Sequence, residues 1–541
     1  MSTQHGPPEV APSGRSLFDL EFVNRFTAEL PGDPESENRR REVKGALFSR
    51  VAPTPTAGPK LVAASPECAT RIGLDPADLS GEDFARVFSG NALLPGMDPY
   101  AMTYGGHQFG HWAGQLGDGR AINLGEVVAP DGSGWTLQLK GAGPTPYSRT
   151  ADGLAVLRSS VREFICSEAM FHLGVPTTRA LSLIETGDRV LRDMFYDGNE
   201  KLEPGAVVCR VARSFVRFGS FELPASRGDV ELIAKLADHV IRTGYPELLS
   251  GDASAPIDRS TYLSWFQELT KRTAHMVAHW TRVGFVHGVM NTDNMSILGE
   301  TIDYGPYGWL EDYDPDWTPN TTDAGGKRYR FGHQSAVAHW NLTRLASALV
   351  PLFDGETEAL QEAVNAYPKL YADEWGRQLA QKLGFETFVE DTDAPLAVEL
   401  FRVLGLAETD MTIFFRRLSE VEADAAPLDE AYYEPEKVSA EARDARDAWL
   451  RDYRARLAQD NATSEDRRAR MNSVNPIYVP RNYLAQLAID EAEKGNHAPV
   501  VELLDVLRRP YEERAGLERY AEKRPEWARH RPGCSMLSCS S

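Results

Sequence analysis

Two side chains with oxygen donors flank a short apolar segment near the middle of the chain. In the stretch FVHGVMNTDNMSILGETIDYG, Asn294 and Asp303 lie on either side of residues 295–298. Such donors suit a hard cation such as Mg²⁺, which takes few protein ligands and completes its shell with phosphate oxygens and water. The pattern therefore predicts a site for a metal ion and a phosphorylated ligand.

The same stretch matches part of the catalytic pattern of protein kinases, in which H-R-D-x-x-x-x-N is followed by a hairpin and D-F-G. His287 and Asn294 keep the spacing, and DYG at 303–305 replaces D-F-G. Val289 occupies the position of the kinase catalytic base, and a valine accepts no proton. Asp293 is the nearest carboxylate that could replace that base.

A lysine at the end of a predicted strand and a glutamate on the next predicted helix form a second pair. In WTLQLK the apolar residues alternate onto one face, which leaves Lys140 on the other face, where its charge could hold a phosphate. Glu163 could pair with Lys140 and fix its direction, as in protein kinases. On these two residues alone, a surface ion pair contributing about 0–1 kcal/mol is the simpler interpretation.

Two glycine-containing turns could bring backbone amides close to phosphate oxygens. Gly117, Gly119 and Arg120 lie in AGQLGDGRAINLGEV, just before a predicted strand. An ordinary Asp-Gly hairpin turn explains these residues equally well. Asp152 and Gly153 precede a predicted helix, whose free amides attract anions. Asp152 is more simply interpreted as the N-cap of that helix.

Two arginines stand seven residues apart in the half-apolar segment VVCRVARSFVRFGSF. Arg210 and Arg217 would share a face of a helix but oppose one another on a strand, and the valine-rich pattern favours a strand. Each arginine needs an anionic partner if it is buried. The pair is therefore a candidate for anion binding, with its geometry left open.

Two histidine pairs have spacings that metal sites use. His275 and His279 are four residues apart, but Met276 replaces the glutamate of the metalloprotease helix. We therefore interpret them as ordinary histidines of a core or surface helix. His107 and His111 in GGHQFGH could ligate a metal, although histidines in glycine-rich loops more often form hydrogen bonds.

Periodicity predicts a β-rich lobe followed by a helical one. Residues 120–127 and 135–140 read as two strands of a hairpin, and residues 154–173 as a helix that ends at Gly174. Apolar residues then recur with helical spacing at 230–243, 261–283, 336–352, 357–383, 391–405 and 409–421. A charged helix near 437–458 and a short helical C-terminal region around 481–508 are expected to follow. Two β-like segments interrupt this half around 285–304. The architecture expected is an α+β, protein-kinase-like bilobal fold with a nucleotide cleft.

The 541 residues exceed what one hydrophobic core serves. We expect an N-terminal extension at 1–45, interpreted as a solvated arm, and a β-rich nucleotide-binding lobe at 46–227. A helical catalytic lobe at 228–430 and a helical C-terminal extension at 431–541 with a cysteine-containing tail would follow.

The net charge of −21 predicts neither nucleic acid nor membrane as a partner, because an acidic surface repels both. A polyanion would need a local basic pocket. The sequence has no signal-peptide pattern and no apolar run of about 20 residues, so we expect a cytoplasmic protein. Its five cysteines form no disulfide framework. Cys534 and Cys539 lie close together on an expected mobile tail, which makes them redox candidates.

With these residues in view, the sequence resembles the selenoprotein O family from about residue 100 onward. The segments that carry the resemblance are YGGHQFG, QLGDGRA, LQLKGAGPTPYSR, ADG, SSVREF, HGVMNTDN and TIDYGP. Cys539 matches the place of the family's selenocysteine. No cysteine lies between Asp303 and Cys534, so a disulfide from the tail to the segment after DYG is excluded.

The resemblance implies a kinase-like enzyme that binds ATP in a flipped orientation, with Mg²⁺ or Mn²⁺, and transfers AMP to Ser, Thr or Tyr hydroxyls of proteins. It implies magnesium ligands at Asn294 and Asp303 and a proton acceptor at Asp293. It also implies the nucleotide contacts Gly117, Gly119, Arg120, Lys140, Asp152, Gly153, Arg210, Arg217 and Asp303.

Two alternatives to adenylylation remain at this point. Ordinary phosphoryl transfer is disfavoured by Val289 in the base position. A pseudokinase scaffold that binds nucleotide without chemistry is disfavoured because Lys140, Glu163, Asn294 and Asp303 are all retained, and a scaffold needs no metal ligands.

Overall fold

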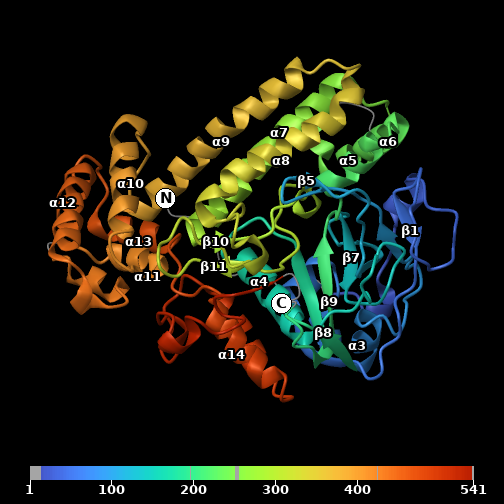
Figure 1. Cartoon of the computed structure of the whole chain (residues 1–541), viewed down its shortest axis with the longest axis horizontal. Coiled ribbons are helices and arrows are strands. Elements are labelled where there is room, and N and C mark those ends of the chain that lie inside the picture. The colour runs from blue at the N-terminus through green and yellow to red at the C-terminus, as the bar shows by residue number, and fades with distance from the viewer. Residues whose placement is uncertain (1–13, 195–196, 250–254, 423, 539–541) are drawn as a thin grey trace.

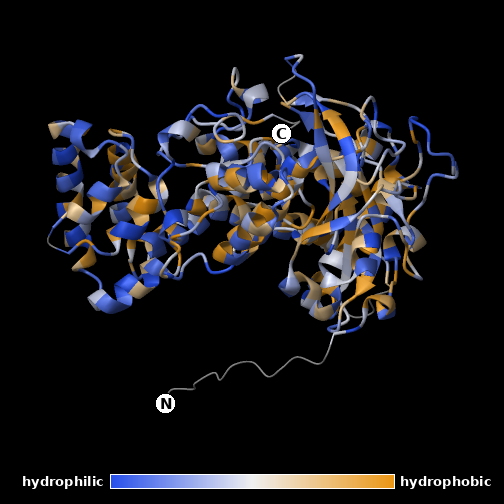
Figure 2. Ribbon diagram, turned by 90° about the horizontal axis from the view of Figure 1, so that it is seen from below, coloured by the Kyte–Doolittle hydropathy of each residue, from blue (hydrophilic) through white to orange (hydrophobic). Residues whose placement is uncertain are grey.

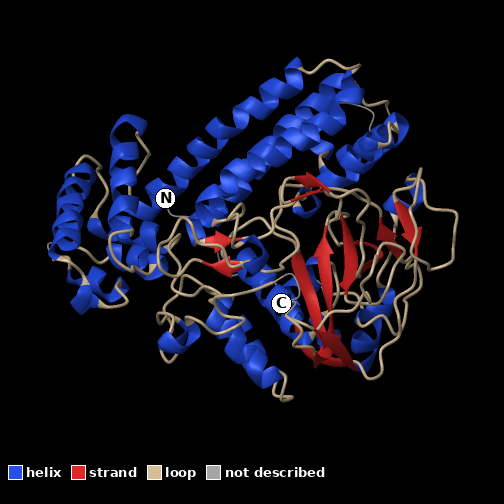
Figure 3. Ribbon diagram, in the orientation of Figure 1, coloured by secondary structure: helices blue, strands red, loops and turns tan. Residues whose placement is uncertain are grey.

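Strands and helices separate into two lobes in the computed structural model (Figure 1). The structure describes residues 14–194, 197–249, 255–422 and 424–538. The strands gather on one side of the molecule and the long helices on the other (Figure 3). The expected α+β fold, with a β-rich lobe followed by a helical lobe, is confirmed.

An antiparallel sheet of seven strands forms the first lobe, in the order β1-β3-β6-β7-β9-β8-β2. The predicted hairpin is confirmed, because Ala121 of β6 pairs with Lys140 of β7. The strands are β1 Phe48–Arg50, β2 Lys60–Ala64, β3 Tyr100–Met102, β6 Ala121–Val128, β7 Gly134–Lys140, β8 Arg179–Arg192 and β9 Lys201–Ala212. A separate hairpin joins β4 His107–Gln108 to β5 His111–Trp112.

Helix α4, Leu157–His172, packs against the sheet and is buried along nearly its whole length. Its residues Val161, Phe164 and Ile165 share one apolar cluster with helices from much later in the chain, α14 Asn482–Ala492 and α15 Ala498–Leu507. These late helices therefore cover the face of α4 that the sheet leaves open. Short helices α1 Arg25–Glu29, α2 Pro66–Arg71 and α3 Glu82–Phe88 complete the first lobe.

The second lobe is helical, as the 3.6-residue periodicity predicts. Its hydrophobic residues lie mainly on the inward faces, and the outer faces are hydrophilic (Figure 2). The helices are α5 Phe218–Ser226, α6 Val230–Gly244, α7 Arg259–Val283, α8 Gln334–Leu349, α9 Glu358–Leu383, α10 Glu390–Leu404, α11 Met411–Leu418, α12 Ala440–Leu457 and α13 Ser464–Asn472.

Two short strands interrupt these helices and pair with each other. They are β10 Phe285–Val286 and β11 Gly308–Trp309, with Phe285 opposite Trp309. The second strand lies beyond the expected limit of residue 304. Residues 295–298 are buried without forming a strand, and Ser296 makes only an isolated β-bridge with Arg217.

The interpretation of residues 1–45 as a solvated arm is wrong for residues 14–45. Leu17 and Leu20 are buried beneath the sheet, and Phe26 stacks on Tyr100 with ring centroids 5.2 Å apart. Phe22 forms a β-bridge with Val127. The charged run that suggested an arm lies at 35–44, and there Arg41 is held by Asp33 at 2.6 Å.

The expectation of a mobile tail is also wrong as far as residue 538. Cys534 is buried, and its carbonyl accepts a hydrogen bond from Asn482 at 2.8 Å. Leu537 pairs with Asn320, and Ser538 bonds to the carbonyl of Met194. Burial raises the pKa of Cys534 to about 11, which disfavours the reactive thiolate. Cys539 lies outside the described residues.

Across the described ranges, no helix combines the length and the apolar character that crossing a bilayer requires.

We predict that Phe26→Ala destabilises the protein and that Phe18→Ala does not. Removing the stacked, buried Phe26 ring leaves a cavity that should cost about 3–5 kcal/mol. Phe18 is 60% exposed, and its loss should change stability by no more than about 0.5 kcal/mol. Thermal unfolding measures both. Equal melting temperatures for the two variants would restore the solvated-arm interpretation.

Candidate active site

A cleft of about 800 Å³ lies between the two lobes and is lined from both. This volume is typical of a site for a nucleotide-sized ligand. The structure brings nearly all the predicted site residues to it. The predicted residues on its wall are Gly117, Gly119, Arg120, Lys140, Asp152, Gly153, Arg210, Arg217, Asp293, Asn294 and Asp303.

Asp303 is the point on which the basic side chains of the cleft converge. Arg210 Nη2 lies 2.7 Å from Asp303 Oδ1, and Arg217 donates to Oδ2. Lys140 Nζ lies 3.8 Å from Oδ1. Burial alone would raise the pKa of Asp303, but these cations, Arg217 foremost, hold it well below its usual range. The carboxylate is therefore charged at any ordinary pH.

Lys140 and Glu163 form a buried ion pair and not a surface one. Lys140 Nζ lies 2.6 Å from Glu163 Oε2, and Arg210 Nε lies 2.5 Å from Oε1. Helix α4 carries Glu163 toward the end of β7. Burial lowers the pKa of Lys140 to about 8, assisted by the charge of Arg210 and opposed by Glu163. Because a buried charge needs a partner, Glu163 keeps both cations in place.

The sequence left open whether Arg210 and Arg217 share a face, and the secondary structure around them gives the answer. Arg210 lies on β9, whereas Arg217 lies beyond the strand, as the N-cap residue of α5. Strand alternation therefore does not separate them. Arg217 also donates to the backbone carbonyl of Asp293 at 2.7 Å and lies over the Tyr104 ring.

Asp293 lies on a short 3-10 helix, Thr292–Asn294, at the floor of the cleft. Its Oδ2 accepts a hydrogen bond from Gln108 at 3.2 Å, and its buried Oδ1 has no hydrogen-bond partner among the described residues. Burial raises the pKa of Asp293 to about 7, opposed by Arg217 and Gln108. One carboxylate oxygen is thus free to accept a proton.

The GGHQFGH hairpin holds the segment that contains Asp293. The His107 amide donates to the Thr292 hydroxyl at 2.7 Å, and the Phe109 amide donates to Asn291 Oδ1 at 3.2 Å. The His107 ring bonds to Glu222, so the hydrogen-bonding interpretation of this histidine holds. Gln108 was missed as a site residue, although the motif was visible, because only its histidines suggested chemistry.

The glycine turns let the backbone pass close to other chain segments. A Cβ at Gly117 would lie 2.4 Å from the Tyr147 ring, and a Cβ at Gly153 would lie 2.3 Å from the carbonyl carbon of Gly143. Both glycines have positive φ, +85° and +77°. Such positions exclude other residues. Close packing requires these glycines, whether or not a phosphate binds there.

Asp152 is not the N-cap of α4, which begins at Leu157 with Val156 as its cap residue. Its carboxylate instead accepts hydrogen bonds from Arg192 at 2.7 Å and 2.8 Å and from the Leu154 amide at 3.0 Å. Arg192 also lines the cleft and was missed. Arg192 lies forty positions from Asp152 in the sequence, and no local pattern links the two residues.

A divalent cation could be held by Asn294 and Asp303. The Asn294 amide nitrogen donates to the Val289 carbonyl at 2.9 Å, which leaves its Oδ1 available as a donor to a metal. Each Asp303 oxygen is engaged by one arginine and keeps a second lone pair. Oxygen donors of this kind fit Mg²⁺ or Mn²⁺.

A family model described as "Protein adenylyltransferase SelO" matches residues 35–508. This chain belongs to the SelO family. A "Protein nucleotidyltransferase YdiU" of Rhodopirellula baltica is 60% identical over 540 residues, which cover 97% of this chain and 100% of the relative. The protein of the same description from Aromatoleum aromaticum is 59% identical over 532 residues, with 97% and 100% covered.

One solved structure, ROP2 from Toxoplasma gondii, is described as having a protein-kinase fold and no enzymatic activity. It aligns at a TM-score of 0.24 and 10% identity, over 56% of this chain and 86% of ROP2. A likeness this low carries no argument. The kinase character of this SelO family member rests on its own elements: the strand lysine paired with a helix glutamate, and the segment from His287 to DYG.

We predict that Gly153→Ala lowers the melting temperature more than Gly174→Ala does. Both glycines have similar positive φ, +77° and +73°, so both variants carry a left-handed backbone penalty of about 1–2 kcal/mol. A Cβ at Gly174 meets no atom within 4 Å, whereas one at Gly153 collides with Gly143. Thermal unfolding isolates the collision as the difference. Equal losses would mean that the turn yields freely.

Proposed function

We propose that this chain is an ATP-dependent protein adenylyltransferase that transfers AMP to Ser, Thr or Tyr hydroxyls of proteins and releases pyrophosphate. The observation that carries the proposal is the convergence of Lys140, Arg210 and Arg217 at Asp303. Membership of the SelO family supports the same activity.

Three cations at one end of a cleft favour the most negative part of the nucleotide. The β- and γ-phosphates of ATP would bind beside Lys140, Arg210 and Arg217, because that is where positive charge is concentrated. The α-phosphorus would then face the incoming hydroxyl. This is the reverse of a kinase, which exposes the γ-phosphate.

The transfer step needs a proton acceptor, and Asp293 is the candidate. The substrate hydroxyl oxygen forms a bond to the α-phosphorus while the bond from that phosphorus to the β-phosphate oxygen breaks. Pyrophosphate leaves with the bonding electron pair, and the hydroxyl proton goes to Asp293. Its unpartnered Oδ1 and raised pKa support this role.

Asn294 and Asp303 would hold Mg²⁺ or Mn²⁺ together with phosphate oxygens. Such an ion offsets the charge that develops on the phosphates. Gly117, Gly119, Arg120, Asp152 and Gly153 would line the remaining length of the nucleotide. The position of Arg120 and Arg192 on the cleft wall supports binding of an anionic ligand.

Two other activities fit the site less well. Ordinary phosphoryl transfer would need a base at Val289, whose side chain accepts no proton. A pseudokinase scaffold would have no use for a buried Lys140–Glu163 pair beside an Asn294 side-chain oxygen that is available to a metal. Adenylylation accounts for both features.

We predict that label from ATP follows the α-phosphate. The protein would be incubated with a generic protein acceptor, Mg²⁺ and ATP labelled at either the α or the γ position. Acceptor labelling is expected with the α label only, since the inner cations retain the γ-phosphate with the leaving group. Asp303→Asn is the control and should abolish labelling. Label arriving from the γ position would identify a kinase instead.

We predict that Asp293→Asn lowers kcat about 10²- to 10⁴-fold and changes ATP affinity by less than about threefold. A general base acts on the transition state, so its loss leaves ground-state binding nearly intact. Single-turnover kinetics and equilibrium ATP binding separate the two effects. Asp316→Asn, at an exposed carboxylate, is the matched control. Parental turnover in Asp293→Asn would assign the proton to another group.

A further inference from the structure

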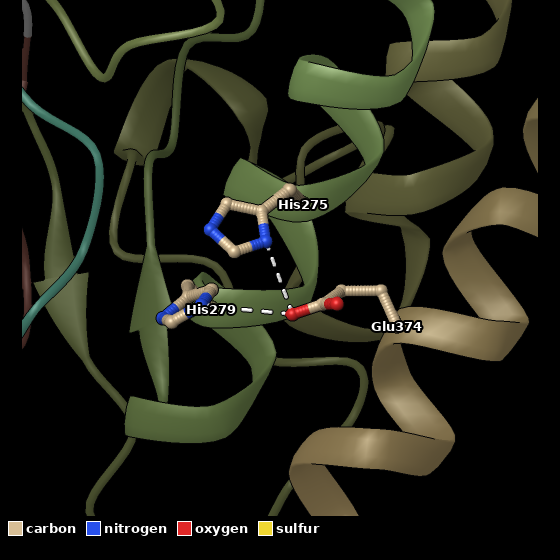
Figure 4. A group of neighbouring side chains, drawn as sticks. All are labelled: His275, His279 and Glu374. Carbon is tan, nitrogen blue, oxygen red and sulfur yellow. Dashed lines mark ion pairs between the residues drawn. The ribbon is translucent and has the colours of Figure 1, made fainter.

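Two histidines and a glutamate outside the cleft direct their ligand atoms toward one another (Figure 4). His275 and His279 lie one turn apart on α7, and Glu374 lies on the neighbouring helix α9. Their ligand atoms all lie within 4.8 Å of one another. The metalloprotease helix motif is incomplete in the sequence, because Met276 replaces its glutamate. In the structure, Glu374 on α9 supplies a carboxylate instead.

We propose that His275, His279 and Glu374 form a zinc site that joins α7 to α9. The ligands would be Nδ1 of His275, Nε2 of His279 and Oε1 of Glu374. This site is separate from the nucleotide cleft, and none of its residues lines that cleft.

The spacing of the ligand atoms fits a tetrahedral ion. Zn²⁺ bound at about 2.0–2.1 Å places adjacent ligands about 3.4 Å apart. Glu374 Oε1 lies 3.1 Å from His275 Nδ1 and 3.7 Å from His279 Nε2. The two distances from Glu374 Oε1 to the histidine nitrogens therefore lie just below and just above the separation expected for tetrahedral ligands. Imidazole and carboxylate ligands also suit zinc better than Mg²⁺ or Ca²⁺.

Nε2 of His279 faces the cluster, and Nδ1 of the same ring lies 3.3 Å from Arg282 Nη2. Gln378 Nε2 donates to Glu374 Oε1 at 2.7 Å and lies 2.8 Å from His279 Nε2. Rotation of the Gln378 amide would present its oxygen as a fourth ligand.

One cation competes for the glutamate. Arg377 donates to both carboxylate oxygens of Glu374, with Nη2 2.5 Å from Oε1. Its side chain is 51% exposed and is free to turn toward solvent. His275 is 44% exposed, which gives an ion a route from solvent. Zinc would thus replace a surface ion pair, which contributes little stability.

The position of the site gives it a structural role. Helix α7 ends at Val283, with Gly284 as its C-cap residue, and leads directly into β10 and the catalytic segment, residues 287–305. Near the same end, Lys382 of α9 donates to the carbonyl of Arg282 at 3.0 Å. Helix α7 positions the catalytic segment, and α9 packs against α7. A metal bridge between them would hold α7 in place.

The test is zinc binding by untagged, chelator-treated and desalted protein in excess Mg²⁺, which occupies sites made of oxygen donors. We expect one zinc per chain by calorimetry and a raised melting temperature. His275→Ala and Glu374→Gln should each weaken binding at least about tenfold. Arg377→Ala should strengthen it about fivefold, because a competing charge is removed. Cobalt should give the intense visible absorption of tetrahedral coordination.

The matched control is His530→Ala, which removes an exposed histidine elsewhere and should leave zinc binding unchanged. Circular dichroism checks that each variant is folded. His275 is half-exposed, so its replacement tests the ligand without opening the core. Absence of stoichiometric zinc binding by the parent would overturn the proposal. The proposal would also be overturned if His275→Ala and Glu374→Gln bound zinc as tightly as the parent protein.

Discussion

The half-buried carboxylate of Asp303 is the constraint on which the arrangement of the site depends. It meets Arg210 from β9, Arg217 from the start of α5 and Lys140 from β7. A buried charge that lost its partners would be strongly destabilising, so each element must stay where its charge is matched. Glu163 extends the same requirement to α4. The electrostatics of five side chains therefore fix how the sheet, its helix and the catalytic segment meet.

The backbone around this carboxylate is itself unusual. Asp303 has a φ of +59°, a conformation that few non-glycine residues adopt. The next residues keep that geometry in place, because Tyr304 is buried and packs against Phe285 with ring centroids 6.0 Å apart. His287 adds a hydrogen bond from its ring to the Ile302 carbonyl at 2.9 Å. Aromatic packing and one buried histidine thus hold the carboxylate toward the cations.

Features encoded by neighbouring residues were predictable from the sequence. The β6–β7 hairpin and the long helices follow from local periodicity, and the segment from His287 to DYG follows from its spacing. Contacts between distant segments had no such signal. The Arg192 partner of Asp152, the Gln108 partner of Asp293 and the glutamate beside His275 and His279 are all set by tertiary packing. The solvated-arm prediction failed for residues 14–45 because it gave more weight to the charged side chains at 35–44 than to the apolar side chains that are buried.

The segment 532–538 has a consequence for how the enzyme is made. It pairs with Asn320 beside the catalytic segment and reaches Met194, next to residues that line the cleft. Helices α14 and α15, which precede it, cover α4. During translation the first lobe emerges long before these parts, and domains generally begin to fold in that order. A nascent chain therefore carries the residues of the cleft before the helices that cover α4 have been made, so α4 gains its cover only late in synthesis.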